Sequence, residues 1–277
     1  MPRMIVVTGA TGNIGLPLVH MLRSGGHAMR VLARDPARAT KLLGPEVPIA
    51  DAASPDALAG AAKAFYLGHP SPTFGAEAGA FAARAKAAGV QHVVAISSGT
   101  IPMQPPTTIG RWHAELEDQM RATGIALTFV RPGNFASNSL RWAGMIRAKS
   151  TVFMAKPDAP SAPIDPHDIA AVACAALVHD GHAGKTYTVQ GPQQMTARQQ
   201  VGVIAEVIGK PINVVEVTPD QARGGMIGGG MPAQMADAIV ELLGRSDPEL
   251  TTTVRDVTGV APRAFATWVT EHRSAFA

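Results

Sequence analysis

Polar side chains that can hold or transfer a proton lie at the end of the segment 91–98 and in the segment that follows it. Ser97 and Ser98 end the apolar run "QHVVAISS", and His113 lies in "GRWHAELEDQM". Histidine titrates near neutral pH, so His113 is a candidate to hydrogen-bond or protonate a bound molecule. Serines at a strand end can face a ligand, although they often only satisfy backbone groups. We predict Ser98 and His113 as catalytic candidates and Ser97 as a cofactor contact. For His113, local packing on its helix is the alternative.

A glycine-rich segment near the start of the chain has the spacing of a dinucleotide-binding turn. In "TGATGNIG", Gly9, Gly12 and Gly15 follow an apolar strand pattern at intervals of three and precede a helical pattern. Glycines in that setting permit a tight turn and a close approach of the backbone to a pyrophosphate, which the N–H groups of the helix then bind. The predicted cofactor contacts here are Gly9, Ala10, Thr11, Gly12, Asn13 and Ile14.

The end of the second predicted strand indicates which dinucleotide is bound. A site for NAD usually has an acidic residue there, which holds both ribose hydroxyls. This strand ends "LAR", and the planar guanidinium of Arg34 can bind a phosphate through two hydrogen bonds. We therefore predict NADP(H) as the cofactor. Asp35 precedes a proline and is expected to cap the next helix, whereas Asp51 ends the third strand and is a candidate to accept from the adenine amine.

These residues need a sheet to bring them together, and the first half of the chain alternates strand and helix patterns. Strands are predicted over 3–10, 28–34, 47–51, 62–68, 91–98 and 126–133. Strands that are apolar nearly throughout are typical of a parallel sheet covered by helices on both faces. Gly68 and His69 follow the fourth strand, at the carboxyl edge where ligands bind, and are predicted cofactor contacts.

The regular alternation of strand and helix patterns ends at about residue 150, which predicts a division of the chain into two domains. The fold class is α/β, a Rossmann-type doubly wound parallel sheet with a small C-terminal α/β lobe. We assign 1–150 to NADP(H) binding and 151–277 to a substrate-binding lobe that interleaves with the sheet. Segment 259–277 is predicted as an amphipathic terminal helix. Segment 224–232, "GGMIGGGMP", fits a flexible lid and a mobile surface loop equally well.

The composition narrows the class of protein. Of the 277 residues, 46% are hydrophobic and 16% charged, which is typical of a folded globular chain. The net charge of +3 comes without a Lys/Arg cluster, so no nucleic-acid partner is expected. The single cysteine, Cys174, is expected to be a buried thiol in a reducing cytoplasm. We see neither a signal peptide nor a membrane span, and expect no metal, since a turn explains the pair His179 and His182. The chain is expected to be a monomer or homodimer.

Several motifs in register resemble the NmrA-like branch of the atypical short-chain dehydrogenase/reductase superfamily. They run in order along almost the whole chain: "VVTGATGNIG", "VLARDPAR", "HVVAISS", "GRWHAELEDQMRATGIALTFVRPGNFASN", "IDPHDIAAVA" and "TGVAPRAFATWVTEH". The resemblance implies a Rossmann domain, a small substrate lobe and a preference for NADPH. It also implies quinone or azo reductase activity, or redox sensing without turnover.

The same resemblance shows where this sequence departs from the wider superfamily. That superfamily places Tyr-x-x-x-Lys on the helix after the fifth strand, but Ile109 and His113 stand at those positions here. The resemblance further implies that Pro132, Gly133 and Asn134 run past the nicotinamide, and that Phe135 and Asn138 face the substrate. A helix cap is the alternative for Asn138.

Loss of the usual acid favours an acceptor that is easily reduced. General acid catalysis is typically worth ~10²–10⁴ in rate, and a quinone or enone can forgo it because its product anion is delocalised. We predict an NADPH-dependent reductase of an aromatic or quinone-like small molecule. A non-catalytic NADP(H) sensor and an isomerase or cyclase remain open. The predicted substrate contacts are Met103, Trp112, Phe135, Asn138 and Trp142.

Overall fold

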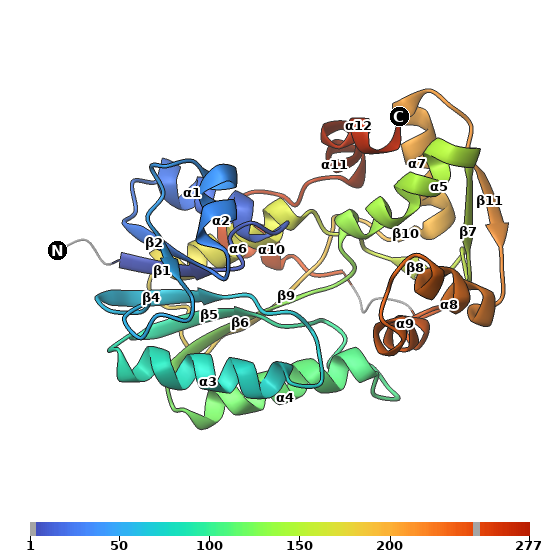
Figure 1. Cartoon of the computed structure of the whole chain (residues 1–277). Coiled ribbons are helices and arrows are strands. Elements are labelled where there is room, and N and C mark those ends of the chain that lie inside the picture. Colours follow the sequence, from blue (N-terminus) through green and yellow to red (C-terminus); the bar gives the residue numbers. More distant parts are fainter. Residues whose placement is uncertain (1–3, 246–249) are drawn as a thin grey trace.

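The computed structural model describes residues 4–245 and 250–277, and its centre is a seven-stranded parallel sheet (Figure 1). The strand order is β3-β2-β1-β4-β5-β6-β9. The bounds are β1 (Met4–Thr8), β2 (Met29–Ala33), β3 (Ile49–Asp51), β4 (Ala61–Tyr66), β5 (His92–Ile96), β6 (Ala126–Pro132) and β9 (Thr186–Val189). The chain order reverses between β1 and β4, and in open α/β sheets such a switch point is where ligands bind.

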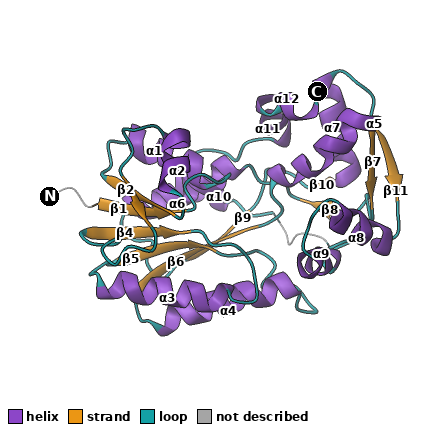
Figure 2. Cartoon of the chain, viewed as in Figure 1, coloured by secondary structure: helices purple, strands orange, loops and turns teal. Residues whose placement is uncertain are grey.

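Helices cover both faces of this sheet (Figure 2). One face carries α1 (Gly15–Ser24), α2 (Pro36–Leu43), α6 (Pro166–Val178) and α10 (Thr253–Thr258), and the other carries α3 (Phe74–Ala87) and α4 (Thr108–Ala122). Each face has its own apolar core, because strands such as β5 are buried along their whole length. The predicted fold class is confirmed, and β3, which follows Pro48, lies at the sheet edge.

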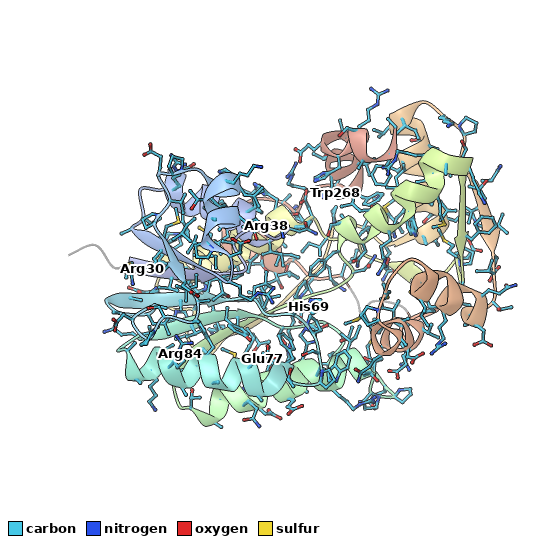
Figure 3. All side chains as sticks on the ribbon, viewed as in Figure 1. Arg30, Arg38, His69, Glu77, Arg84 and Trp268 are labelled. Atoms are coloured by element: carbon cyan, nitrogen blue, oxygen red, sulfur yellow. The ribbon has the colours of Figure 1, made fainter. Side chains whose placement is uncertain are left out.

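A smaller lobe packs beyond the carboxyl ends of the strands, at the right of Figure 1. Its core surrounds Trp268, which is 2% exposed and is labelled in Figure 3. The lobe contains the 3-10 helix η1 (Ala136–Trp142), α5 (Ala143–Lys149), β7 (Thr151–Met154), β8 (Pro160–Ser161), β10 (Met195–Thr196), α7 (Ala197–Ile208), β11 (Asn213–Glu216), α8 (Pro219–Gly228), α9 (Ala233–Val240), α11 (Phe265–Glu271) and α12 (Arg273–Phe276).

Two later segments differ from the predicted elements. The predicted terminal helix over 259–277 is instead two short helices, α11 and α12, which meet at His272. The break lets Phe276 reach the core beside Trp268, with ring centroids 6.3 Å apart. Segment 224–232 is the end of α8, a turn and Pro232 as the cap of α9, so it is largely helical; a lid role stays untested.

The predicted helix cap at Asp35 is confirmed. The Asp35 side chain accepts from the backbone N–H of Arg38 and caps α2. Within the described residues, no helix combines the length and apolarity of a membrane span. In the same part of the chain, no three His, Cys, Asp or Glu side chains are grouped to hold a metal ion. Cys174 is partly buried rather than buried as predicted; desolvation raises the pKa of its thiol to about 11, so the thiol stays protonated at neutral pH.

Candidate functional site

The predicted cofactor residues all follow strands of the main sheet and therefore share its carboxyl edge. In sheet order, this edge carries Asp51 at the end of β3, Arg34 after β2, the glycine turn after β1, Gly68 and His69 after β4, Ser97 after β5, and Pro132 to Asn134 at the end of β6. Neighbouring strands lie about 4.8 Å apart, so the edge from β2 to β6 spans about 19 Å. Figure 3 places His69 at this edge, between the sheet and the C-terminal lobe.

Steric and backbone constraints require glycine at two positions of the turn after β1. Gly9 has a φ of +63°, a left-handed conformation that a side chain would strain. A Cβ on Gly15 would lie 2.1 Å from the Gly9 carbonyl oxygen, so the start of α1 packs directly on the turn. A Cβ on Gly12 would meet only that oxygen, at 3.3 Å, so the fold constrains Gly12 much less than Gly15. Its outward face is the one left for a ligand.

The start of α1 offers free backbone donors beside this turn. Ile14 caps the helix without a side-chain hydrogen bond, and its first turn contains no acidic residue. A helix start carries a partial positive charge, which favours an anion such as a pyrophosphate. Asn13 and Ile14 lie where the prediction placed them, at the beginning of α1.

Arg34 and Asp51 lie on neighbouring strand ends at one side of the turn. Asp51 pairs with Ala33 in the β2–β3 ladder, directly before Arg34. Arg34 is exposed and, among the described residues, its guanidinium has no hydrogen-bond or ion-pair partner. The Asp51 carboxylate accepts from the backbone N–H of Ala53 at 2.8 Å, which fixes the turn and leaves its second oxygen available. A free guanidinium at this position suits a phosphate.

Thr8 ties the glycine turn to the loop after β4. Its hydroxyl accepts from the Leu67 N–H at 2.8 Å and donates to the Phe65 carbonyl at 3.2 Å. A Cβ on Gly9 would lie 3.0 Å from the Leu67 side chain, so the two loops are in contact. Gly68 and His69 continue from there, and His69 is exposed.

A buried carboxylate that the sequence analysis did not identify organises the edge around β5 and β6. Glu117 on α4 is 1% exposed and accepts from Arg131 Nε and Nη2, both at 2.7 Å. It also accepts from Ser97 Oγ at 2.6 Å and from Arg121 at 2.7 Å. Burial alone would raise the pKa of Glu117, but the hydrogen bonds from Arg131, Ser97 and Arg121 outweigh it and lower the pKa. The Ser97 hydroxyl is therefore committed to positioning α4, and its predicted cofactor contact stays a prediction.

Two signals in the sequence could have indicated this network. Glu117 is an acidic residue on the apolar side of a helix, between Leu116 and Met120, which are fully buried. Arg131 interrupts the apolar strand segment "TFVRPG". Charged residues are rarely buried unless they are paired, so each of these residues implied a partner.

The geometry of His113 decides its tautomer. Its Nδ1 lies 2.8 Å from the carbonyl oxygen of Ile109, which can only accept, so Nδ1 carries the hydrogen. Burial lowers the pKa of His113, against smaller raising effects of that hydrogen bond and of Glu117. The ring, packed edge-on to Phe74, is neutral at neutral pH, and Nε2 is then an acceptor rather than a proton donor.

Ser98 lies beside the end of β6 because the β5–β6 pairing continues past both strands. The Ser97 N–H donates to Val130 at 2.7 Å and the Gly99 N–H to Pro132 at 2.9 Å. The Ser98 hydroxyl lies 2.8 Å from that of Thr100 and accepts from the Thr100 N–H at 3.2 Å. The structure thus brings Ser98 next to Pro132 and Gly133; its catalytic role stays a prediction.

The loop after β6 joins the sheet to the small lobe through a chain of polar side chains. Asn138 Nδ2 donates to Asn134 Oδ1 at 2.8 Å, and Asn134 Nδ2 donates to Ser161 Oγ at 3.2 Å. Gln200 on α7 donates to the same hydroxyl at 3.3 Å. Phe135 forms a parallel bridge with Ile164. Asn138 lies inside η1 and does not cap it.

The predicted substrate contacts Trp112, Trp142 and Met103 differ in burial. Trp112 is 9% exposed and packs in the core beneath α3 and α4. Trp142 is half-buried against the core of the small lobe, and Met103 is half-buried in the loop before α4. Trp112 is therefore the most deeply buried of the predicted substrate contacts.

Neither tyrosine of the chain stands in for the missing acid on α4. Burial, with a smaller effect of Glu77, raises the pKa of Tyr66 to about 12, which makes its hydroxyl a weak proton donor. Tyr187 lies in β9, opposite Val130, and its hydroxyl is engaged with His182 Nδ1 at 2.8 Å.

A cavity of about 270 Å³ lies at the opposite, amino edge of the sheet. Lys63 and Asp180 line it, 3.8 Å apart, and Lys63 also donates to the His179 carbonyl. It lies away from the carboxyl edge, so we assign it no role in cofactor binding.

Comparison with known proteins identifies the family. Residues 9–180 match the model of a family described as NAD(P)H-binding. The chain belongs to this NAD(P)H-binding family. Two relatives cover 99% of the chain and are themselves 99% covered. One is an NAD(P)H azoreductase from Xenophilus azovorans, at 36% identity. The other is a (4-alkanoyl-5-oxo-2,5-dihydrofuran-3-yl)methyl phosphate reductase from Streptomyces griseus, at 38%.

A solved structure shares the fold along almost the entire chain. An NADPH-dependent quinone oxidoreductase from Escherichia coli, in complex with NADPH, has a TM-score of 0.85 at 23% identity and covers 97% of this chain. The match spans 99% of that structure, so the small lobe is part of the shared architecture. The predicted NAD(P)H-binding family and fold are confirmed.

Proposed function

We propose that this NAD(P)H-dependent reductase uses NADPH to reduce a quinone, an enone or a similar activated aromatic acceptor. The reaction moves hydride from NADPH to the acceptor, and a proton from solvent completes the product, so that NADP⁺ and the hydroquinone or saturated ketone are formed. The observation that carries the proposal is the protonation state at the α4 positions: an isoleucine side chain and a neutral imidazole that presents an acceptor. Such a site can hold reactants but supplies no strong acid, which suits an acceptor whose reduced anion is delocalised.

The activities named for the two relatives support the same class of acceptor. One relative is named as an azoreductase and the other as the reductase of a 4-alkanoyl-5-oxo-dihydrofuran, in which a ring alkene is conjugated with carbonyl groups. An N=N bond and a conjugated alkene both accept hydride without a carbonyl-protonating tyrosine. The cofactor chemistry is hydride donation, and the protein positions and shields the reactants.

Different residues at the carboxyl edge of the sheet bind the cofactor and position the helix α4. Gly12 and the start of α1 receive the pyrophosphate, and Arg34 holds the 2′-phosphate. Since His113 is neutral with Nε2 unprotonated, we assign it to accept from a hydroxyl of the bound nucleotide rather than to protonate the substrate. Glu117 acts as a positioning residue, because it locks α4 to β6 through Arg131.

The test follows NADPH oxidation at the absorbance band of the reduced nicotinamide, with a panel of quinones, enones and simple ketones. We expect turnover with quinones and enones and none with simple ketones. His113→Ala should raise the KM for NADPH while turnover persists, since no acid is removed. Tight NADPH binding without oxidation across the panel would contradict reductase activity and indicate a sensor.

A further inference from the structure

The amino end of α4 is completed by a side chain from the second half of the sequence. Thr107 caps the helix through the N–H of Gly110 at 3.0 Å, and the first turn, 108–111, contains no acidic residue in the sequence. The Thr108 N–H has no acceptor within its own helix. Glu241, 133 residues further along, supplies one at 2.6 Å and also accepts from the Thr108 hydroxyl at 2.8 Å. The bond from this N–H lowers the pKa of Glu241, and a carboxylate is the charge that a helix start favours.

A second group of contacts joins the same segment to the main domain. Arg245 Nη1 donates to the carbonyl oxygens of Gln104 at 3.1 Å and Pro105 at 3.2 Å, in the loop before α4. Its Nε donates to the Glu241 carbonyl at 2.8 Å, which fixes the two side chains relative to each other. On the apolar side, Ala238 of α9 is 1% exposed and belongs to the core that contains α3 and α4. α9 therefore comes from the second half of the sequence but packs on the main domain.

The other end of the connection belongs to the small lobe. Before α8, the Val217 N–H donates to the Met154 carbonyl at the end of β7, at 3.0 Å. An ion pair between Arg223 and Asp237 joins α8 to α9. In α8, all of whose residues are described, none is buried, so α9 and its contacts hold α8 in place. We call residues 219–245 the bridge; Figure 1 shows it between α4 and β7.

The bridge is attached beside the part of α4 that the proposed reaction uses. Thr108 precedes Ile109, whose carbonyl oxygen fixes the tautomer of His113. The same turn packs on the loop after β5, since a Cβ on Gly110 would lie 2.8 Å from the Thr100 carbonyl oxygen. The first turn of α4 is thus held between that loop and the bridge. The glycine turn that receives the cofactor lies farther along the edge, after β1.

We propose that Glu241 is a positioning residue whose contact with Thr108 latches the bridge across the side of the candidate site that faces the small lobe. This inference rests on the proposed reductase function and adds to it how the lobe is held closed over the substrate. Glu241 is exposed, so water competes for its hydrogen bonds and the latch opens and closes. If the substrate binds only the closed form, its apparent Kd rises as the closed fraction falls.

Two variants of the full-length protein break the latch from opposite sides. Glu241→Ala removes the carboxylate. Thr108→Pro removes the N–H and the hydroxyl, but proline suits the first position of a helix, and Thr107 before it already has the extended backbone that proline requires, with φ −90° and ψ 158°. The second variant therefore separates loss of the latch from loss of the α4 cap.

Steady-state kinetics with NADPH and menadione, a small quinone, measure the effect. Both variants should raise the KM for menadione about 3- to 30-fold, the range of a lost helix cap. The kcat should stay within about threefold of the wild type, because saturating quinone holds the bridge closed, and the Kd for NADPH should also stay within about threefold. Glu206→Ala removes an exposed carboxylate from α7 of the same lobe and should change none of these values.

Amide hydrogen exchange tests the latch without turnover. Both variants should speed exchange in the bridge, 219–245, whereas exchange in the rest of α4 should stay as in the wild type in Thr108→Pro. Menadione added to the NADP⁺ complex of the wild type should slow exchange in the bridge.

Wild-type KM and wild-type exchange of the bridge in Thr108→Pro would overturn the proposal and leave Glu241 as a cap of α4. An unchanged KM in Glu241→Ala, or a loss of kcat and NADPH affinity as large as the change in KM, would overturn it as well. If the wild type oxidises NADPH with no quinone, the proposed function fails by itself. Exchange of the bridge in the two variants then decides about the latch: faster exchange supports it, and unchanged exchange overturns it.

Discussion

Two glycine-rich segments of this chain look alike in composition and differ in what the glycines do. In the turn after β1, a Cβ on Gly15 would lie 2.1 Å from the Gly9 carbonyl, and Gly9 itself has a positive φ. At Gly224, Gly225 and Gly228 in α8, an added Cβ would meet nothing within 4 Å. Gly9 and Gly15 of the first segment are required by backbone geometry and packing, whereas the packing around the three glycines of α8 would accept side chains.

The comparison teaches how to interpret glycine in a sequence. Steric need marks the turn after β1 as a place where the backbone must stay bare, which is the requirement of a pyrophosphate site. α8 has no buried residue, and each glycine lowers its intrinsic stability, so this helix is held weakly. Because α8 is a weakly held helix of the small lobe, a lid role for 224–232 stays a hypothesis.

The largest effect is expected at the tightest glycine. Gly15→Ala should destabilise the protein by about 3 kcal/mol or more, because the methyl group overlaps backbone atoms that cannot move without breaking the β1–α1 turn. Thermal unfolding measures this, with Gly144→Ala as the matched control, since a Cβ there meets nothing within 4 Å. Equal melting temperatures for the two variants would show that the turn is not sterically constrained.

Gly12→Ala separates binding from folding within the same turn. Its Cβ would lie 3.3 Å from the Gly9 carbonyl, so the stability should change by less than about 1 kcal/mol. The methyl group stands where the pyrophosphate must approach, and affinity for NADPH should fall roughly tenfold or more, about 1.4 kcal/mol. Calorimetry and thermal unfolding together test this; a loss of stability without a loss of affinity would contradict it.

Ionisable side chains, rather than close backbone packing, hold the segment before α11 in place. We therefore expect a pH dependence of stability here that the glycine turn lacks. Asp168 on α6 accepts from the Arg263 N–H at 2.7 Å, and burial, with Asp165, raises its pKa to about 6. A raised acid pKa contributes stability that is complete below about pH 4 and is lost as the pH rises through 6.

Asp168→Asn should remove that contribution. Between pH 4 and pH 7, the wild type should lose about 2 kcal/mol of unfolding free energy relative to the variant, since one pKa unit corresponds to about 1.4 kcal/mol. Urea unfolding at several pH values measures the difference, in which the other titrating groups cancel. Parallel curves for the two proteins would rule out Asp168 as the source.

The smallest effect is expected in α8. Gly225→Ala should stabilise the protein by about 0.5–1 kcal/mol, because alanine is the better helix former and its methyl group meets no neighbour. Denaturant unfolding measures the gain, and NADPH affinity serves as the control that should not change. A destabilised variant would mean that this glycine is required after all.

Much of the sheet and of the cofactor edge could be predicted because the signals are local. The glycine turn and the cap at Asp35 each depend on a few consecutive residues. Arg34 follows its strand directly, so its place at the edge needed only the end of β2.

The remaining features depend on contacts between distant segments, which no local pattern encodes. Glu117 meets Ser97 and Arg131 only after β5, α4 and β6 have packed, so Ser97 could be placed at the edge but its partner could not be predicted. Likewise, the period of the last helix did not reveal the break at His272, which depends on where the lobe core receives Phe276.

The account depends most on the nucleotide at the edge and on the guanidinium that selects it. Calorimetry of the wild type and of Arg34→Ala with NADPH and with NADH tests this directly. We predict that the wild type binds NADPH about 10- to 100-fold more tightly than NADH, the range of a charge-assisted phosphate contact, and that Arg34→Ala loses this preference while its NADH affinity stays the same. Equal affinities in the wild type, or a preference that survives in Arg34→Ala, would contradict the proposed cofactor selection.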